Sequence, residues 1–139
     1  MPSKRLILPL PIRRLAYSIL WKVYNMGDCI FCKIVAGEAK ADIVYKDERV
    51  TAFRDIHPIA PTHILIVPNK HIASVGALEE ADAPIAGQLL LTARHLAERE
   101  GIAASGFRII TNTGVDGGQT VPHLHIHLIG GKHMQFPMG

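Results

Sequence analysis

The sequence contains no apolar run approaching the ~20 residues that a membrane-spanning helix needs. Two prolines and Lys22 interrupt the apolar residues near the N-terminus. That region also lacks the uninterrupted apolar stretch, ending in small residues, that marks a secretory signal. We therefore expect a cytoplasmic domain without a transmembrane segment.

Acidic residues are absent from the first 26 residues of the chain. This segment carries five cations, which are Lys4, Arg5, Arg13, Arg14 and Lys22. Since the whole chain has a net charge of only +3, the remainder is slightly acidic. A nucleic-acid-binding domain needs a basic surface, so we expect no nucleic-acid partner and, at most, an anion site of mononucleotide size.

The basic segment has three competing interpretations. Its apolar residues recur at helical spacing after Pro11, which would suit an amphipathic helix in contact with a membrane surface or a partner protein. It could equally be an arginine-rich targeting peptide, or it could precede the true first residue, Met26. We favour the last interpretation and predict a basic N-terminal extension over 1–26 and one folded domain over 27–139.

Hydrophobic residues make up 48% of the chain, enough for the core of a single domain. A long helix is expected to begin with Asp82 as its cap and to end at Gly101. Its expected apolar face consists of Ile85, Leu89, Leu90, Ala93, Leu96 and Ala97. The other expected elements are a short helix over 30–36 and strands over 43–46, 50–54, 63–68, 107–112 and 122–129. This order predicts an α+β fold in which an antiparallel sheet of about five strands packs against one long helix.

Three histidines alternate with aliphatic residues in the last expected strand, as His123-Leu124-His125-Ile126-His127-Leu128. Side chains of an extended strand point alternately to opposite faces, so the imidazoles share one face while the aliphatic residues enter the core. Neighbours on one face stand roughly 6.6 Å apart, close enough for two imidazoles to bind one phosphate or one metal ion.

A glycine-rich loop precedes these histidines, as Thr113-Gly114-Val115-Asp116-Gly117-Gly118-Gln119-Thr120. Glycine permits positive φ and a close approach of the backbone to a ligand, so the loop could bind an anion through its N–H groups. On its own the loop is weak evidence of an anion site, because most such segments are simple turns between two strands.

The histidine pattern resembles the signature of the histidine triad (HIT) superfamily, in which three histidines alternate with hydrophobic residues. Further motifs are similar to the nucleotide-binding Hint branch: Phe53-Arg54-Asp55-Ile56 with Pro58, Ala60-Pro61-Thr62-His63, Val67-Pro68-Asn69-Lys70-His71, Asn112 and Gly117-Gly118-Gln119. The resemblance runs from about Cys29 to Gly139. It implies a HIT-like fold whose sheet is extended by homodimerisation, and a hydrolase with a purine nucleotide as small-molecule partner and no organic cofactor.

The resemblance also implies the roles of individual residues. His125 would be the nucleophile that forms a nucleotidyl-histidine intermediate, with His127 and Thr120 as proton donors and His63 as a neighbour that orients a ring. The implied nucleotide-binding residues are Ile30, Phe31, Ile34, Phe53, Asp55, Ile56, Asn112, Gly118, Gln119, Thr120, Val121, His125 and His127. The implied activity is that of a purine nucleoside phosphoramidase on adenosine or guanosine 5′-monophosphate derivatives, with adenosine preferred.

Several of these positions have plainer interpretations. Phe53 is as well explained by the core as by a nucleobase, and Asp55 could merely shape the turn before Pro58. Three other histidines, His57, His95 and His133, are expected to be solvated surface residues. Arg54, His57 and Phe136 differ from the residues of animal members, which puts the leaving-group preference in doubt.

Cys29 and Cys32 are the only cysteines, in a C-x-x-C spacing that lets two thiolates reach one ion. By resemblance to bacterial members, His71 and His123 would complete a structural zinc site. A redox pair and an inert pair of thiols are the alternatives, although the order of elements lacks a thioredoxin-like context.

Three other functions remain open on the sequence. The triad could bind a hydrolytic metal ion, which would make the protein a metalloenzyme. The chain could instead be a regulatory module that binds purine nucleotides and hydrolyses them incidentally. Within the enzymes, the second candidate is a dinucleoside polyphosphate hydrolase.

Overall fold

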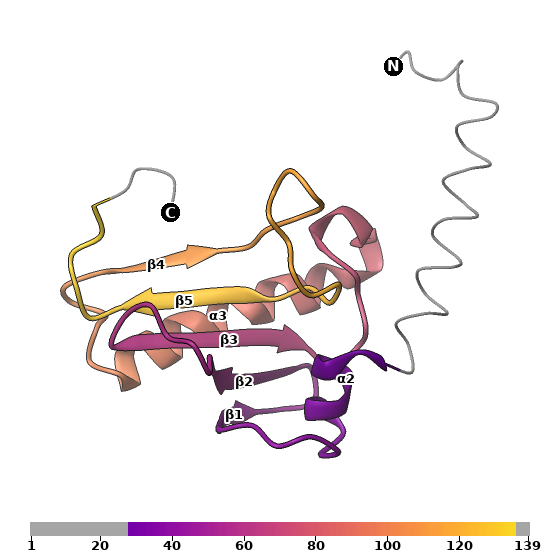
Figure 1. Ribbon diagram of the computed structural model, residues 1–139, viewed down its shortest axis with the longest axis horizontal. Helices are drawn as coiled ribbons and strands as arrows, with labels where there is room; N and C mark the ends of the chain where they lie inside the picture. Colours follow the sequence, from indigo (N-terminus) through magenta and orange to yellow (C-terminus); the bar gives the residue numbers. More distant parts are fainter. Residues whose placement is uncertain (1–27, 136–139) are drawn as a thin grey trace, which may run out of the picture.

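The computed structural model describes residues 28–135, and within them no helix is both long enough and apolar enough to cross a bilayer. The strands are β1 (Ile43–Lys46), β2 (Val50–Arg54), β3 (Thr62–Pro68), β4 (Phe107–Ile110) and β5 (Ile126–Gly130). They form one antiparallel sheet in the order β1-β2-β3-β5-β4 (Figure 1). The helices are α2 (Ile30–Val35) and α3 (Ala83–Arg99), with 3-10 turns at Val75–Ala77 and Glu80–Asp82. The predicted α+β class and order of elements are confirmed, while the predicted extension, residues 1–26, and Phe136 lie outside the described residues.

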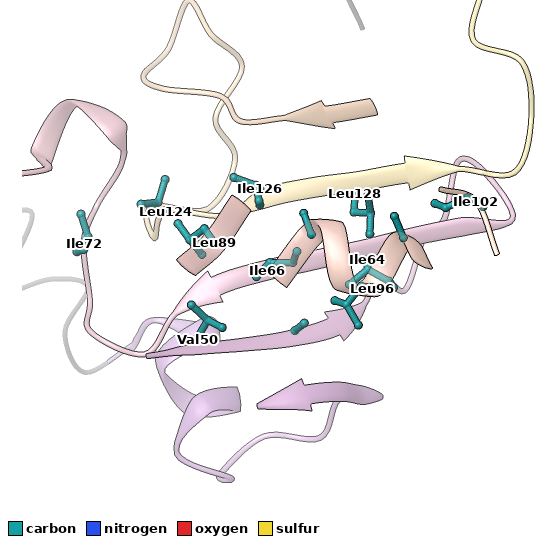
Figure 2. Close-up of a cluster of buried hydrophobic side chains, with 13 residues drawn as sticks. Val50, Ile64, Ile66, Ile72, Leu89, Leu96, Ile102, Leu124, Ile126 and Leu128 are labelled. Carbon is teal, nitrogen blue, oxygen red and sulfur yellow. The ribbon is translucent and has the colours of Figure 1, made fainter. Parts of the chain in front are cut away.

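One face of the sheet is covered by α3, which lies behind the strands in Figure 1. Alternate residues of the strands point toward it, and Ile64, Ile66 and Leu128 are fully buried beneath Leu89 and Leu96 of the helix (Figure 2). Burying such aliphatic side chains contributes about 1.5–3 kcal/mol each, so this layer is a large source of the stability of the domain.

The opposite face of the sheet carries a second, smaller cluster beside α2. Phe53, Leu65 and Val67 point to this side and pack with Phe31 and Ile34 of the short helix. Because the strands alternate, every residue of β3 and β5 that does not face α3 faces this side. His63 of β3 and His127 of β5 therefore lie on the face that α3 leaves uncovered.

The last strand begins later than the sequence predicts. The expected strand over 122–129 starts only at Ile126, so His123 and His125 precede it. Other groups satisfy the backbone there, since the Leu124 N–H donates to the Ile72 carbonyl and the Thr111 hydroxyl donates to the His125 carbonyl. Strand β4 also ends earlier than predicted, at Ile110 and not at residue 112. Thr111, the next residue, meets the His125 carbonyl through its side-chain hydroxyl and not through its backbone.

Two details of the long helix also differ from the prediction. Leu90 is 56% exposed, whereas Thr92 is buried in the face that meets the sheet. Asp82 does occupy the cap position, but its carboxylate does not cap the helix. It accepts instead from Lys70 Nζ at 2.7 Å and from the Glu79 N–H at 2.9 Å, which closes the 3-10 turn before α3.

Candidate active site and metal centre

The register of the two central strands brings His63 and His127 together. His127 of β5 pairs with Leu65 of β3, and His63 pairs with Ile129, so the two histidines are diagonal neighbours on the face opposite α3. The His63 and His127 rings have centroids 5.2 Å apart, and His127 and His125 are 5.1 Å apart. These three histidines form one cluster.

The tautomer of His125 follows from its backbone partner. His125 Nδ1 lies 2.7 Å from the carbonyl oxygen of His123. A carbonyl only accepts hydrogen bonds, so Nδ1 carries the proton and Nε2 of the neutral ring holds a lone pair. His125 is therefore set up as a nucleophile at Nε2.

A chain of hydrogen bonds fixes the other two rings of the cluster. His63 Nδ1 accepts from the Ile59 N–H at 3.2 Å, so His63 Nε2 carries the proton of the neutral ring. His63 Nε2 lies 2.9 Å from His127 Nδ1 and 3.3 Å from a carboxylate oxygen of Asp55. His127 Nδ1 thus accepts, and the proton of His127 is left on Nε2.

Burial keeps these rings neutral. It lowers the pKa of His125 and of His63, although the Asp55 carboxylate opposes the shift. It also lowers the pKa of His127 to about 4, with help from the neighbouring His125 and His63. The cluster therefore presents one lone pair and one N–H donor at neutral pH, as a nucleophile and a proton donor require.

Cys29, Cys32, His71 and His123 form a second group, and their ligand atoms lie within 4.8 Å of one another. His123 Nδ1 is 3.3 Å from Cys29 Sγ, 3.6 Å from Cys32 Sγ and 3.1 Å from His71 Nδ1. Cys32 Sγ is 3.2 Å from His71 Nδ1. Two sulfur and two nitrogen atoms at these separations could hold one metal ion in tetrahedral coordination.

The partners of His123 fit this assignment. His123 Nε2 donates to the Pro68 carbonyl at 2.9 Å, so the lone pair of the neutral ring is on Nδ1, inside the group. Burial lowers the pKa of His123 to about 4, which keeps the ring in the neutral form that binds metals.

A third group, Asp55, His63 and His127, is also compact enough to hold an ion. There the atom of His63 that faces the group, Nε2, carries the proton, because Nδ1 accepts from the Ile59 N–H. A metal ion would need a lone pair at that position. The tautomers thus favour a metal ion at the group that contains Cys29 and Cys32, and hydrogen bonding within the cluster of His63, His125 and His127.

The glycine-rich loop is held by Gln119. Its Nε2 donates to the Ala73 carbonyl at 2.7 Å and to the Val121 carbonyl at 2.9 Å, and its Oε1 accepts from the Gly114 N–H at 3.0 Å. Only glycine fits at position 117, where a Cβ would lie 2.4 Å from the Thr113 oxygen. Gly118 has φ of 76°. The shape of the loop therefore depends on the Gln119 side chain and on glycine at positions 117 and 118.

A cavity of about 270 Å³ opens beside the loop. Its lining residues are Ala73, Ser74, Thr113, Gly114, Val115, Gln119, Thr120 and Pro122. Thr120 is exposed at its edge, which leaves its hydroxyl accessible to a ligand.

The residues expected to bind a nucleoside differ widely in their exposure to solvent. The rings of Phe31 and Phe53 meet edge-on, with centroids 5.4 Å apart, in the buried cluster that also contains Ile34. Ile30 and Ile56 are 45% and 84% exposed. Asp55, Asn112 and Val121 are half-buried, and the three histidines expected on the surface, His57, His95 and His133, are exposed.

Backbone groups that sequence reasoning did not identify complete the site. They are the Ile59 N–H, the Pro68 carbonyl and the His123 carbonyl, and the Thr111 hydroxyl joins them by holding the His125 carbonyl. The His123 carbonyl and the Ile59 N–H lie only two and four residues from the rings that they meet, but the turn of the backbone that aims them is not visible in the residue types. The Pro68 carbonyl reaches His123 from another segment of the chain.

Comparison with known proteins places these features in a family. A family model described as the HIT domain matches residues 36–134. Purine nucleoside phosphoramidase of Escherichia coli (strain K12) is 50% identical over 105 residues, which cover 76% of this chain and 88% of that protein.

Solved structures agree with this result. A HIT family hydrolase from Legionella pneumophila superposes with a TM-score of 0.79 at 45% identity, covering 81% of this chain and all (100%) of that one. A HIT family hydrolase from Clostridium thermocellum superposes with a TM-score of 0.77 at 49% identity, covering 80% of this chain and 96% of that one. The chain therefore belongs to the HIT domain family and is a HIT family hydrolase.

Proposed function

We propose that this hydrolase is a purine nucleoside phosphoramidase that acts through a nucleotidyl intermediate on His125, with adenosine preferred over guanosine. The observation that carries the proposal is the hydrogen bond from His125 Nδ1 to the His123 carbonyl, which leaves a lone pair on Nε2. The similarity to the phosphoramidase of Escherichia coli supports the choice of substrate.

The reaction proceeds in two displacements. In the first, the His125 Nε2 lone pair forms a bond to the phosphorus of the nucleoside phosphoramidate, and the P–N bond to the amine breaks. The leaving nitrogen takes the proton of His127 Nε2, whose position as a donor is set by His63, and the positive charge that the new bond places on the His125 ring offsets the negative charge left on His127. In the second, water attacks phosphorus, the bond to His125 breaks, and the water proton returns to His127. One amine and one nucleoside monophosphate are released, and the enzyme is restored.

The remaining site residues bind and orient the substrate in this proposal. The Thr120 hydroxyl would donate to a phosphate oxygen. Gly118, whose N–H donates to the Val115 carbonyl at 3.0 Å, and Gln119 hold the loop in shape. Asp55 and Asn112 would bind the ribose and its phosphate end. Ile30, Phe31, Ile34, Phe53, Ile56 and Val121 would line the base pocket.

We also propose that the ion held by Cys29, Cys32, His71 and His123 is structural zinc. The donor set of two thiolates and two imidazoles is one that Zn²⁺ prefers, and four protein ligands leave no open position for water. When bound, zinc supplies a cross-link between the segment that begins α2, the residues after β3 and the residues before β5.

Homodimerisation and a cytoplasmic location complete the proposal. Strand β4 is an edge of the sheet, and its Phe107 and Ile109 are 37% and 36% exposed, which would suit pairing with a second copy. Sedimentation of the purified protein at several concentrations tests the dimer, and a monomer at all of them would contradict it.

Rapid quenching during turnover tests the proposed chemistry. Protein mixed with an adenosine phosphoramidate, quenched and digested should carry one nucleotidyl group on the peptide that contains His125. The His125→Ala protein should carry none and should lose nearly all activity. A wild-type protein that turns over substrate without any covalent nucleotide would refute the proposal.

A further inference from the structure

His123 joins the metal-binding group to the catalytic histidine. Its side chain belongs to the metal group, where Nδ1 lies 3.3 Å from Cys29 Sγ and 3.1 Å from His71 Nδ1. Its backbone belongs to the active site, where the carbonyl oxygen accepts from His125 Nδ1 at 2.7 Å. One residue therefore contributes a ring nitrogen to the metal group and the carbonyl that sets the tautomer of His125.

A second connection runs through Phe31. Its ring meets the His125 ring edge-on, with centroids 5.2 Å apart and an interplanar angle of 82°, and it also contacts His123 at 5.8 Å. Phe31 is only 6% exposed, so it forms one wall around the His125 ring. The Phe31 ring therefore restricts the rotation of the His125 imidazole.

The helix that carries Phe31 depends on its anchors. With six residues, α2 is far shorter than a helix that is stable on its own. Cys29 caps its first turn by accepting from the Cys32 N–H at 3.4 Å, and both cysteines belong to the metal group. Because they flank Phe31 in the sequence, metal binding would fix this side chain as well.

We propose that the metal centre is a positioning device for catalysis, in which His123 and Phe31 act as positioning residues for His125. The inference rests on the proposed function, since it takes His125 as the nucleophile. With the metal bound, the His123 carbonyl stays aimed at His125 Nδ1 and Phe31 stays against the ring. Without the metal, His125 gains access to its other tautomer, which has its proton on Nε2 and cannot attack phosphorus.

Histidine NMR tests this coupling without relying on activity. Protein labelled with ¹⁵N-histidine is compared after loading with Zn²⁺ and after removal of Zn²⁺ by EDTA, with His125 assigned from the spectrum of the His125→Asn protein. We expect a single Nδ1–H tautomer for His125 with zinc, and a mixture of both tautomers without it. Formation of nucleotidyl-His125 from an adenosine phosphoramidate should slow about 10-fold or more in the metal-free protein. Identical His125 signals in the two states would overturn the proposal.

Substitutions keep the test decisive if removal of zinc unfolds the protein. In the zinc-loaded Phe31→Leu protein, the zinc content should be unchanged while His125 shows mixed tautomers. Val35→Ala, a half-buried residue of the same helix and the same apolar cluster with no ring to set against His125, is the matched control and should retain the single tautomer. If the Phe31→Leu spectrum matches that of the control, Phe31 does not position the His125 ring and this part of the proposal is wrong.

A ligand variant tests the His123 connection in the same way. Serine at position 29 can still accept the N–H of the first turn but is a poor zinc ligand. Cys29→Ser should therefore bind Zn²⁺ more weakly and show the mixed tautomers of the metal-free protein. A single His125 tautomer in Cys29→Ser protein that has lost its zinc would contradict the coupling.

The same samples separate this inference from the proposed function. If the tautomer responds to zinc but no nucleotide is found on His125 after quenching, the proposed chemistry fails and the coupling stands. If nucleotidyl-His125 forms equally well with and without zinc, the proposed chemistry stands and the coupling fails.

Discussion

At the scale of single residues, the site works by assigning one proton to each imidazole. His125 donates at Nδ1 to the His123 carbonyl, and His63 accepts at Nδ1 from the Ile59 N–H. His127 accepts from His63 and so keeps its proton on Nε2. The three similar side chains thereby take different chemical roles, which are set by backbone groups two and four residues away in the sequence and by the contact between His63 and His127 across the sheet.

Removal of the donor to His127 tests this assignment. His63→Phe fills similar space but offers no N–H, so the tautomer of His127 is no longer fixed. We expect kcat/KM for an adenosine phosphoramidate to fall about 100-fold, within the range of other residues that orient a catalytic ring. His95→Phe, on the exposed side of α3, should keep wild-type activity. Equal activity of the two variants would rule out the assigned role of His63.

Substitution of Gln119 tests how the loop is held. Gln119→Glu replaces two N–H donors by a carboxylate oxygen that faces the carbonyls of Ala73 and Val121. We expect the affinity for AMP, measured by calorimetry, to fall about 10-fold and the free energy of unfolding to fall by about 1–3 kcal/mol. Asp116→Asn, exposed in the same loop, should change neither. Wild-type AMP affinity in the Gln119→Glu protein would show that the amide does not shape the loop.

At the scale of elements, α3 and the sheet define where chemistry can occur. The helix packs on one face over β2, β3 and β5, and the register of β3 and β5 places His63 and His127 on the other face (Figure 1). Two contacts near the C-terminal end of α3 set how closely the helix and sheet approach. One is the packing of Ile102 on Gly130, and the other is the ion pair between Arg54 and Glu100.

The Ile102 contact requires glycine at position 130. A Cβ there would lie 2.5 Å from Ile102 Cδ1, so Gly130→Ala should lower the free energy of unfolding by about 1–3 kcal/mol. The double variant with Ile102→Val, which lacks that methyl group, should recover part of the loss in urea denaturation. Gly87→Ala, in α3 with no atom within 4 Å of its Cβ, should instead stabilise by up to about 1 kcal/mol. The absence of recovery in the double variant would count against this contact as the cause.

The ion pair makes stability depend on pH in a defined direction. Arg54 binds Glu100 through two hydrogen bonds of 3.0 and 2.8 Å, and this contact lowers the pKa of Glu100 below its usual 4.5. A carboxyl group whose pKa is lower in the folded protein contributes stability above its unfolded pKa, and this contribution is lost as the pH falls.

Glu100→Gln should therefore lower the free energy of unfolding by about 1 kcal/mol near neutral pH, since both side chains are partly solvated. The difference from the wild type should vanish well below pH 4.5, where the carboxyl of Glu100 is protonated. Glu98→Gln, in an exposed pair with Arg94, should have a smaller effect. A difference that grows toward acidic pH would contradict the sign of the shift.

At the scale of the whole molecule, the fold was more predictable from the sequence than the site. Strands and helices follow from local periodicity, so their order and most of their bounds were predicted correctly. The start of β5 was not, because Thr111 and Ile72 occupy the backbone of residues 124 and 125 from a distance. The exposure of Leu90 was missed because an apolar stripe does not specify which of its edges meets the sheet.

The different roles of His123, His125 and His127 could not be predicted from their spacing either. Spacing predicts only that three imidazoles share a face, and it is compatible with a phosphate or a metal ion. The structure turns His123 toward Cys29 and His71, and leaves His125 beside His127 and His63. The choice depends on α2 and the residues after β3, which approach from other parts of the chain.

The central claim is that a histidine of this chain, and not water, attacks phosphorus first. The most direct test is the stereochemical course of hydrolysis of an adenosine phosphorothioamidate of known configuration at phosphorus, carried out in ¹⁸O-labelled water. Each in-line displacement inverts phosphorus, so two displacements through His125 predict overall retention. Overall inversion would show a single attack by water and would contradict the account.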